Sequence, residues 1–155
     1  MENITLKPIG YVSNEIVEKK DDFWGNTIST ITLTEEFQGG LTGLQDFSHA
    51  IILCYLDKAC YQPKKHLLRR PRNRQDMPML GIFSQRTKDH PNPIGVTAVE
   101  ILSVSDSVLT VKGLDAMDGT PVLDIKPYFP AFDKREARTP GWVDVLMKNY
   151  FHPSF

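Results

Sequence analysis

The sequence has little cysteine, no long hydrophobic run and almost no net charge, and each of these absences excludes a class of protein. The two cysteines, Cys54 and Cys60, have no partner pair and no histidine at metal-ligand spacing, which argues against a zinc site and for a reducing compartment. No stretch approaches the roughly 18 apolar residues that a membrane helix needs, and the amino terminus lacks the pattern of a signal peptide. We therefore expect a cytoplasmic protein with no metal site and no membrane span.

Charge is balanced over the whole chain but concentrated in one segment. The sequence has 18 Lys and Arg residues against 19 Asp and Glu residues, so any binding to nucleic acid must come from a local patch. Residues 61–79, which we call the basic loop, are stiffened by prolines at 63, 71 and 78. The loop is either a solvated face or a contact surface for backbone phosphates, and we expect nothing nearby to neutralise it. Its cations are Lys64, Lys65, Arg69, Arg70, Arg72 and Arg74.

Short runs of apolar residues recur along the chain and predict strands. One domain over residues 1–155 suits this length and a hydrophobic content of 41%. No glycine-rich turn follows the first strand and no long helices alternate with strands, which excludes a doubly wound nucleotide-binding fold. We predict a mainly β, closed or nearly closed barrel of about seven strands, with a helical turn within 34–44 and a terminal helix within 141–151. The expected strands lie within 4–12, 29–33, 49–57, 80–85, 95–105, 107–114 and 122–126.

An aromatic pair interrupts a charged, loop-like segment at residues 14–26. Phe23 and Trp24 stand between two acids and a glycine, in a segment with little other reason to bury anything. Two interpretations are open. Trp24 either fastens the loop to the core or belongs to a lid whose aromatic ring faces a ligand.

The segment DGTPVLDIKPY at residues 118–128 places two opposite charges on one short strand. Because side chains alternate faces with period two, Asp124 and Lys126 are expected on one face together with Val122. Pro121 and Pro127 remove ladder donors and stiffen both ends, which suits the mounting of a site. The alternative is a solvated Asp/Lys pair on an edge strand.

Three segments together resemble a known family. They are FSQR at residues 83–86, HPNPIG at 90–95 and LDAMDGTPVLDIKPY at 114–128, with weaker similarity in IGYV at 9–12 and GLQDFSH at 43–49. These blocks are similar to those of the TsaA-like or YaeB family, the TrmO-type tRNA methyltransferases. The resemblance implies a β-barrel that works as a homodimer and binds S-adenosylmethionine near the subunit boundary.

The same resemblance implies which residues contact the cofactor. Asp115 suits ribose hydroxyls or an ammonium group, the backbone at Gly113 allows close approach to adenine, and Arg86 offers a fork for a carboxylate. The alternatives are a surface ion pair for Arg86 and a plain strand end for Asp57 and Lys58. The contacts implied by the resemblance are Asp57, Lys58, Arg86, Val96, Lys112, Gly113, Leu114 and Asp115. Trp24 is a further candidate cofactor contact, on the alternative that it belongs to a lid.

Transfer of a methyl group to an adenine amine requires help, because the nitrogen lone pair is delocalised into the ring. A positioned acceptor for the N–H proton and tight alignment must lower the barrier. Asp118 and Asp124 are chemically suitable acceptors, Tyr128 suits orientation or proton relay, and Lys126 suits a negatively charged acceptor. Asp118 is also part of an Asp-Gly dipeptide, which is common in turns for purely structural reasons.

The acceptor implied by the resemblance is N6 of threonylcarbamoyl-adenosine beside the tRNA anticodon, a base with its own carboxylate. Arg86, Lys126 and the basic loop supply cations for it. His90 stands where the family usually has an arginine, and we place His90 and Asn92 with the substrate contacts. A methyltransferase for a small-molecule acceptor and a non-catalytic barrel that binds S-adenosylmethionine or RNA remain alternatives.

Overall fold

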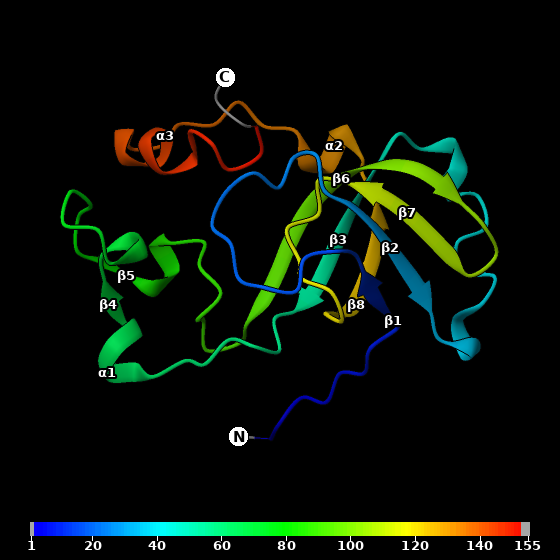
Figure 1. Cartoon of the computed structure of the whole chain (residues 1–155), viewed down its shortest axis with the longest axis horizontal. Coiled ribbons are helices and arrows are strands. Elements are labelled where there is room, and N and C mark those ends of the chain that lie inside the picture. Colours follow the sequence, from blue (N-terminus) through cyan, green and yellow to red (C-terminus); the bar gives the residue numbers. More distant parts are fainter. Residues whose placement is uncertain (1, 153–155) are drawn as a thin grey trace.

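A computed structural model describes residues 2–152, and its main element is a closed antiparallel barrel of six strands (Figure 1). The strands follow one another around the barrel in the order β1-β2-β7-β6-β3-β8. Closure pairs the first and last of these strands, so no barrel strand keeps an open edge. The strands are β1 (Gly10–Ser13), β2 (Ile28–Leu33), β3 (His49–Tyr55), β6 (Ile94–Val104), β7 (Val108–Lys112) and β8 (Pro121–Pro127).

Alternating side chains explain how these strands enclose a core. In β3 the side chains of Ala50, Ile52 and Cys54 are buried, while those between them are half-buried. The continuous apolar run of this strand therefore does not mean burial on both faces, because only the inward face is fully covered. The barrel interior contains mostly branched residues, with Ile31, Leu109, Val111 and Val122 among those with no exposed surface.

The predicted fold class is confirmed, with six barrel strands in place of about seven. Residues 80–85 do not join the barrel. Instead, β5 (Leu80–Gly81) pairs with β4 (Leu68–Arg69) in a separate two-stranded sheet and then continues as the 3-10 turn η4 (Ile82–Ser84). The first strand begins only at Gly10, since Pro8 has no N–H for a ladder bond. Only the residues after it pair.

The helices are short and lie in the connections. They are α1 (Pro63–His66), α2 (Pro130–Asp133) and α3 (Gly141–Met147), with further 3-10 turns η1 (Glu35–Phe37), η2 (Leu44–Asp46) and η3 (Pro71–Asn73). The terminal helix predicted within 141–151 is present as α3. None of the helices described over residues 2–152 combines the length and the apolar character that a membrane crossing requires.

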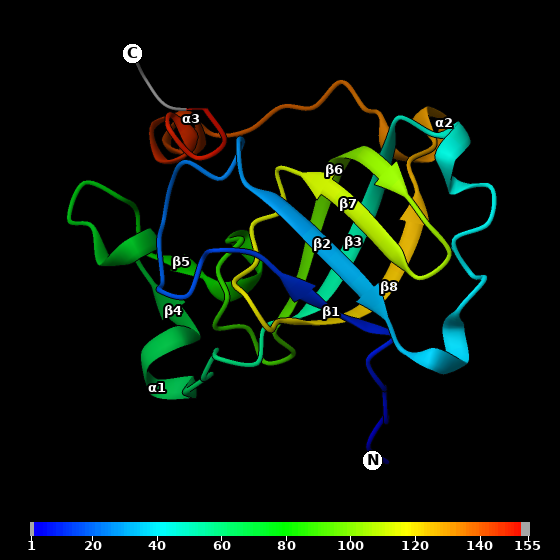
Figure 2. The same ribbon diagram turned by 45° about the vertical axis from the view of Figure 1, so that its right-hand side comes forward.

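Three segments that are distant in sequence gather beside one end of the barrel (Figures 1 and 2). They are the loop 14–27 between β1 and β2, residues 61–93 between β3 and β6, and the carboxy-terminal segment 141–152 with α3. We call residues 61–93 the excursion. This end of the barrel, where β7 ends and β6 begins, is called the site end, and the opposite end is called the far end.

A bulge in β8 changes which residues share a face. Leu53 of β3 pairs with Asp124, but the next residue, Cys54, pairs with Val122. Leu123 is therefore an extra residue, and the side-chain alternation shifts by one position there. The prediction that Val122 shares a face with Asp124 and Lys126 is thus wrong, because Val122 is fully buried while the two charged residues form an ion pair of 2.8 Å.

Candidate cofactor and active site

Asp115 lies at the site end at the centre of a small hydrogen-bonded cluster. Gly113 directly follows β7 with a left-handed backbone (φ 93°) and donates its N–H to the carbonyl of Thr27 at 2.9 Å. This turn sends Leu114 into the core, where it is 1% exposed, and leaves Asp115 half-buried. A residue with a Cβ would be strained at this φ, which explains the glycine.

Two hydroxyl groups hold the Asp115 carboxylate. Thr97 of β6 donates its Oγ1–H to Oδ1, and Tyr150 of the carboxy-terminal segment donates its hydroxyl to Oδ2 at 2.5 Å. Burial, followed by the charge of Asp115, raises the pKa of Tyr150, so its hydroxyl stays protonated and donates. Each carboxylate oxygen has a second lone pair, and Asp115 can therefore accept further hydrogen bonds from a ligand.

Arg86 and Val96, two of the predicted cofactor contacts, are in contact with each other. The Nη2 of Arg86 donates to the carbonyl of Val96 at 2.7 Å, and the side chain is otherwise exposed. This bond fixes one edge of the guanidinium and leaves other N–H donors available for a carboxylate. Because Val96 directly precedes Thr97, the arginine is tied to the strand that also holds Asp115.

The remaining predicted cofactor contacts also lie around the site end. Lys112 is the last residue of β7 and is half-buried, whereas Asp57 and Lys58 are exposed just beyond the end of β3. Nothing in the hydrogen bonding of the described residues connects Asp57 or Lys58 to Asp115. Their assignment as cofactor contacts stays a prediction.

Trp24 belongs to the loop 14–27 and is 4% exposed. Its backbone N–H donates to the carbonyl of Tyr150 at 2.8 Å, and Lys20 Nζ lies 4.4 Å from the ring centroid. The loop approaches so closely that a Cβ on Gly25 would lie 1.8 Å from the carbonyl oxygen of Phe151. These contacts favour the interpretation of Trp24 as an anchor, and its role as a cofactor lid stays a prediction.

The four predicted catalytic residues do not converge within one chain. Asp118 lies at the site end, before β8, and Tyr128 follows β8 at the far end, where its N–H donates to the carbonyl of His49 at 3.1 Å. A strand of seven residues spans about 20 Å. Asp124 and Lys126 lie on the outward face between these ends.

Local contacts account for two of these four residues. Asp118 Oδ1 accepts the N–H of Asn14 at 3.0 Å, and its own N–H donates to Ile16 at 2.8 Å, which is a turn that joins two loops. Asp124 Oδ1 accepts the N–H of Ile125 at 2.9 Å, and the hydrogen bond from Lys126 to Asp124, followed by the charge of Asp124, raises the pKa of Lys126. These interactions would suffice for a structural role, and they leave a catalytic role untested.

The basic loop is more neutralised than its sequence suggests. Arg72 pairs with Asp22 of the loop 14–27 at 3.1 Å, and Arg74 pairs with Asp76 at 2.6 Å. Arg69 lies 3.7 Å from Asp89. The expectation that nothing nearby neutralises the loop is therefore wrong, because folding brings in Asp22 and Asp89 from outside the loop and Asp76 pairs locally with Arg74.

Three of the six cations of the loop have no acidic partner within residues 2–152. Within residues 2–152, Lys64 and Lys65 are exposed and form no ion pair, while Arg70 donates to the carbonyl of Met77 at 2.5 Å. Met77 is 2% exposed. The basic loop is thus a folded part of the excursion around its own small buried centre, with its two lysines available to solvent.

His90 and Asn92 lie in the Pro-Asn-Pro bend that leads into β6. His90 Nε2 is 3.0 Å from the carbonyl of Gln85, and its ring centroid is 6.2 Å from that of Phe83. Asn92 is exposed, and its carbonyl accepts the N–H of Ile94 at 2.8 Å. Both residues lie close in sequence to Arg86, and their contact with a substrate stays a prediction.

Three residues of this region were not predicted as site residues. Thr97 and Tyr150 complete the Asp115 cluster, and Phe83 lies beside His90. The alternation of side chains along β6 could have predicted that Thr97 faces the barrel interior. No sequence signal connects Tyr150 to Asp115. Tyr150 lies within 141–151, the range in which only a terminal helix was predicted.

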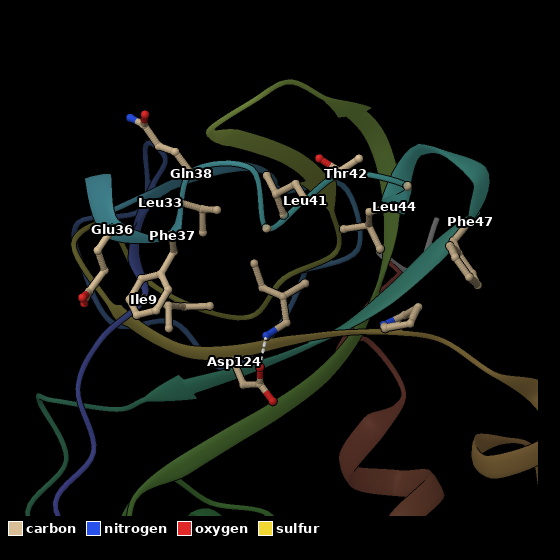
Figure 3. A pocket seen from close by; sticks show the side chains of 14 residues that line it. Ile9, Leu33, Glu36, Phe37, Gln38, Leu41, Thr42, Leu44, Phe47 and Asp124 are labelled. Atoms are coloured by element: carbon tan, nitrogen blue, oxygen red, sulfur yellow. Dashed lines mark hydrogen bonds between the residues drawn. The ribbon is translucent and has the colours of Figure 1, made fainter.

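A separate hollow of about 670 Å³ opens at the far end of the barrel (Figure 3). Its wall is mainly apolar and includes Leu33, Phe37 and Leu41, with Asp124 at its edge. This hollow lies at the end opposite Asp115 and contains none of the residues matched to the cofactor. In the described residues 2–152 we find no group of three or more His, Cys, Asp or Glu side chains that could hold a metal ion.

Fold and site together define a small antiparallel barrel with a carboxylate and a guanidinium at one end, a class suited to a polar, zwitterionic ligand. Residues 14–134 match the family described as the tRNA-methyltransferase O N-terminal domain, and the chain belongs to this family.

Relatives agree with this assignment. A probable S-adenosyl-L-methionine-binding protein of Pyrococcus abyssi is 34% identical over 150 residues, which cover 91% of this chain and 77% of that protein. The tRNA (adenine(37)-N6)-methyltransferase of Mus musculus is 39% identical over 140 residues, but these cover only 32% of the mouse protein. The crystal structure of TrmO from Pseudomonas aeruginosa matches with a TM-score of 0.75 and 29% identity, over 92% of this chain and 64% of that one.

Proposed function

We propose that this protein is an S-adenosylmethionine-dependent methyltransferase that acts on N6 of an adenine in tRNA. Relatives that bear the names of S-adenosylmethionine-binding proteins and of tRNA adenine N6-methyltransferases support both halves of this proposal. The observation that carries it is the arrangement around Asp115, a carboxylate held by two hydroxyl donors beside the left-handed Gly113, inside the region that matches the family.

The residues at the site end fit the proposed cofactor chemically. Asp115 retains acceptor capacity for ribose hydroxyls or an ammonium group, and Arg86 retains N–H donors for a carboxylate. The exposed position of Arg86 and the half-buried position of Asp115 leave both accessible to a ligand. When bound, S-adenosylmethionine supplies an activated methyl group. The protein's own contribution is to orient this group and to accept a proton from the adenine amine.

We propose threonylcarbamoyl-adenosine next to the anticodon as the acceptor. Its carboxylate requires cations, and Arg86, Lys64 and Lys65 are the exposed ones closest in sequence to the predicted substrate contacts His90 and Asn92. Asp118 is the carboxylate among the catalytic candidates that lies at the site end. It is therefore our choice of proton acceptor within a single chain.

We further propose that the protein works as a homodimer in the cytoplasm. Lys126 and Tyr128 lie toward the far end of β8, so a second copy would be needed to bring them to the cofactor of the first. Stacked aromatic rings lie near them, with centroid distances of 5.8 Å for Phe47 and Phe129 and 6.0 Å for Phe129 and Phe132. All three rings are exposed in the single chain, which would suit burial against a partner.

A titration and a nucleoside assay test this function. Calorimetric titration of S-adenosylmethionine into the folded protein should give saturable binding. Incubation with the cofactor and tRNA that carries threonylcarbamoyl-adenosine should then yield its methylated form, detected by mass spectrometry of the nucleosides. Binding without methylation of any tRNA would favour the non-catalytic barrel, and absence of binding would refute the proposal.

Subunit mixing tests the composite site. Chains with Asp115→Ala and chains with Tyr128→Phe, each inactive as pure dimers, should recover part of the parent activity when refolded together, because a mixed dimer contains one intact pair of residues. If the mixture stays as inactive as its components, the two residues do not act across a subunit boundary.

A further inference from the structure

Phe83 is an aromatic side chain that the excursion holds out into solvent. Its surface is 81% exposed, although its neighbour Ile82 is 1% exposed and anchors the turn η4. The amide of Gln85 strengthens this anchor by donating to the carbonyls of Arg69 at 2.9 Å and Leu80 at 3.1 Å. A phenyl ring that a well-fixed turn presents to water, when burial would gain about 1.5–3 kcal/mol, is a candidate contact for a partner.

The ring of His90 lies beside that of Phe83 and adds a second aromatic ring to this surface. The two ring centroids are 6.2 Å apart and the rings are tilted by 53°. His90 is fixed by its contact of 3.0 Å with the carbonyl of Gln85. Nucleobases stack on exposed aromatic rings of this kind without a requirement for one base, since every base has a π face.

The electrostatic surroundings of this pair favour nucleic acid over a neutral or basic partner. The excursion, residues 61–93, contains eight Lys and Arg residues against two Asp residues, whereas the whole chain contains 18 against 19. The backbone connects the pair to the exposed lysines, because Ile82 N–H donates to the carbonyl of Leu67 at 2.9 Å, directly after α1 with Lys64 and Lys65. Phosphates could therefore lie on the lysines while a base lies on the rings.

The position of the pair relative to Asp115 indicates which base this would be. Phe83 is three residues before Arg86, whose guanidinium is bound to Val96 at 2.7 Å, and Val96 precedes the Thr97 that holds Asp115. In Figure 1 the excursion lies beside the barrel on the same side as the carboxy-terminal helix α3. A strand of RNA bound at the site end would thus lie next to the excursion.

We propose that Phe83 and His90 form a stacking platform for an RNA base that neighbours the methyl acceptor, while Lys64 and Lys65 contact the adjoining phosphates. The platform determines how the acceptor base is presented, and it rests on the proposed function. It makes no contact with the cofactor. Its removal should therefore weaken RNA binding and leave binding of S-adenosylmethionine unchanged.

A fluorescent RNA tests the platform directly. The probe is a hairpin with the sequence of a tRNA anticodon arm, with 2-aminopurine next to the adenosine to be methylated. Stacking on Phe83 should quench its fluorescence when the parent protein binds. Phe83→Ala should abolish the quenching and weaken binding by roughly 5- to 150-fold, the range for loss of one base–aromatic stack. Phe83→Trp should keep both, and Tyr11→Ala, which removes an exposed ring of β1 that has no part in the proposed site or subunit contact, is the matched control.

The salt dependence of RNA affinity distinguishes the contribution of base stacking from that of phosphate contacts. Because Phe83→Ala removes no phosphate contact, its plot of log affinity against log salt should run parallel to that of the parent, with the same slope. Parent-like affinity and quenching in Phe83→Ala, with the parent still active on tRNA, would overturn the platform alone. A change from dimer to monomer in sedimentation would instead make Phe83 part of a subunit contact and also overturn it. If the parent binds no RNA at all, the proposed function itself fails.

Discussion

The hydroxyl of Tyr150 donates a hydrogen bond of 2.5 Å to Oδ2 of Asp115, across 35 residues of sequence. This bond joins the end of the chain to the carboxylate at the site end of the barrel. The same segment also accepts N–H groups from Phe23 and Trp24, through the carbonyls of Asn149 and Tyr150. The carboxy-terminal segment therefore fixes both the loop 14–27 and the side chain that we expect to contact the cofactor.

Tyr150→Phe should lower both stability and cofactor affinity. The substitution leaves the partly buried Asp115 with one hydroxyl donor in place of two, so the free energy of unfolding should fall by about 1–3 kcal/mol. Binding of S-adenosylmethionine should weaken because the carboxylate is no longer fixed. Urea unfolding and calorimetric titration measure the two effects. Tyr128→Phe is the control for stability, since the Tyr128 hydroxyl has no hydrogen-bond partner within residues 2–152. Equal midpoints for the two variants would contradict the prediction.

The same tyrosine predicts how stability depends on pH. Because the pKa of Tyr150 is raised in the folded protein, the hydroxyl keeps its proton there when the unfolded chain has begun to lose it near pH 10. The folded state then binds more protons than the unfolded state, so stability is present below about pH 10 and declines above it. The difference in unfolding free energy between the parent and Tyr150→Phe should therefore shrink as pH rises above about 10. A constant difference would show that the hydroxyl does not carry the effect.

Arg86→Ala should weaken binding of S-adenosylmethionine with little effect on folding. A charge-assisted hydrogen bond to a carboxylate contributes about 1.5–3 kcal/mol, which corresponds to roughly 10- to 150-fold in affinity. Arg86 is exposed, and its one intramolecular bond is to the carbonyl of Val96. Arg74→Ala is the matched control, because this arginine pairs with Asp76 on the surface of the excursion. If both variants bind the cofactor equally well, Arg86 is a structural residue of the surface.

Much of the fold could be predicted from the sequence because alternating apolar residues directly encode the inward face of a barrel. The bulge at Leu123 could not be predicted, since it depends on how β8 fits against β3 and not on any residue preference in its own sequence. For the same reason Val122 was assigned to the wrong face. The departure of residues 80–85 from the barrel likewise depends on their pairing with β4.

The site could be predicted only in part, and for a related reason. Motifs that are local in sequence, such as Gly113 with Asp115 or Arg86 near Val96, were found because their members lie close along the chain. The pairing of Arg72 with Asp22 and of Tyr150 with Asp115 joins residues that are 50 and 35 positions apart. Such contacts form only when the excursion and the carboxy-terminal segment fold back onto the site end.

The two lysines of α1 should account for part of the salt dependence of tRNA binding. Lys64 and Lys65 are exposed and form no ion pair within the described residues, so each is free to neutralise one phosphate. Each neutralised phosphate contributes about 0.7–0.9 to the slope of log affinity against log salt, and Lys64→Ala with Lys65→Ala should lower the slope by about 1.4–1.8. Arg72→Ala should change the slope less, because Asp22 already pairs with Arg72. Equal slopes for the parent and the double variant would show that the lysines contact only solvent.

The two cysteines should differ sharply in reactivity in the folded protein. Cys60 is exposed, whereas Cys54 faces the barrel interior, and burial together with the nearby charge of Asp115 raises the pKa of its thiol to about 12. Since the thiolate is the reactive form, a disulfide reagent at pH 8 should label Cys60 rapidly and reach Cys54 only when the barrel opens. Cys60→Ser should therefore leave a single slow phase, and in urea this phase should accelerate toward the rate of global unfolding. Two rapid phases in the parent would mean that the site end of the barrel is open to solvent, which would also contradict the buried position of Cys54 next to the Asp115 cluster.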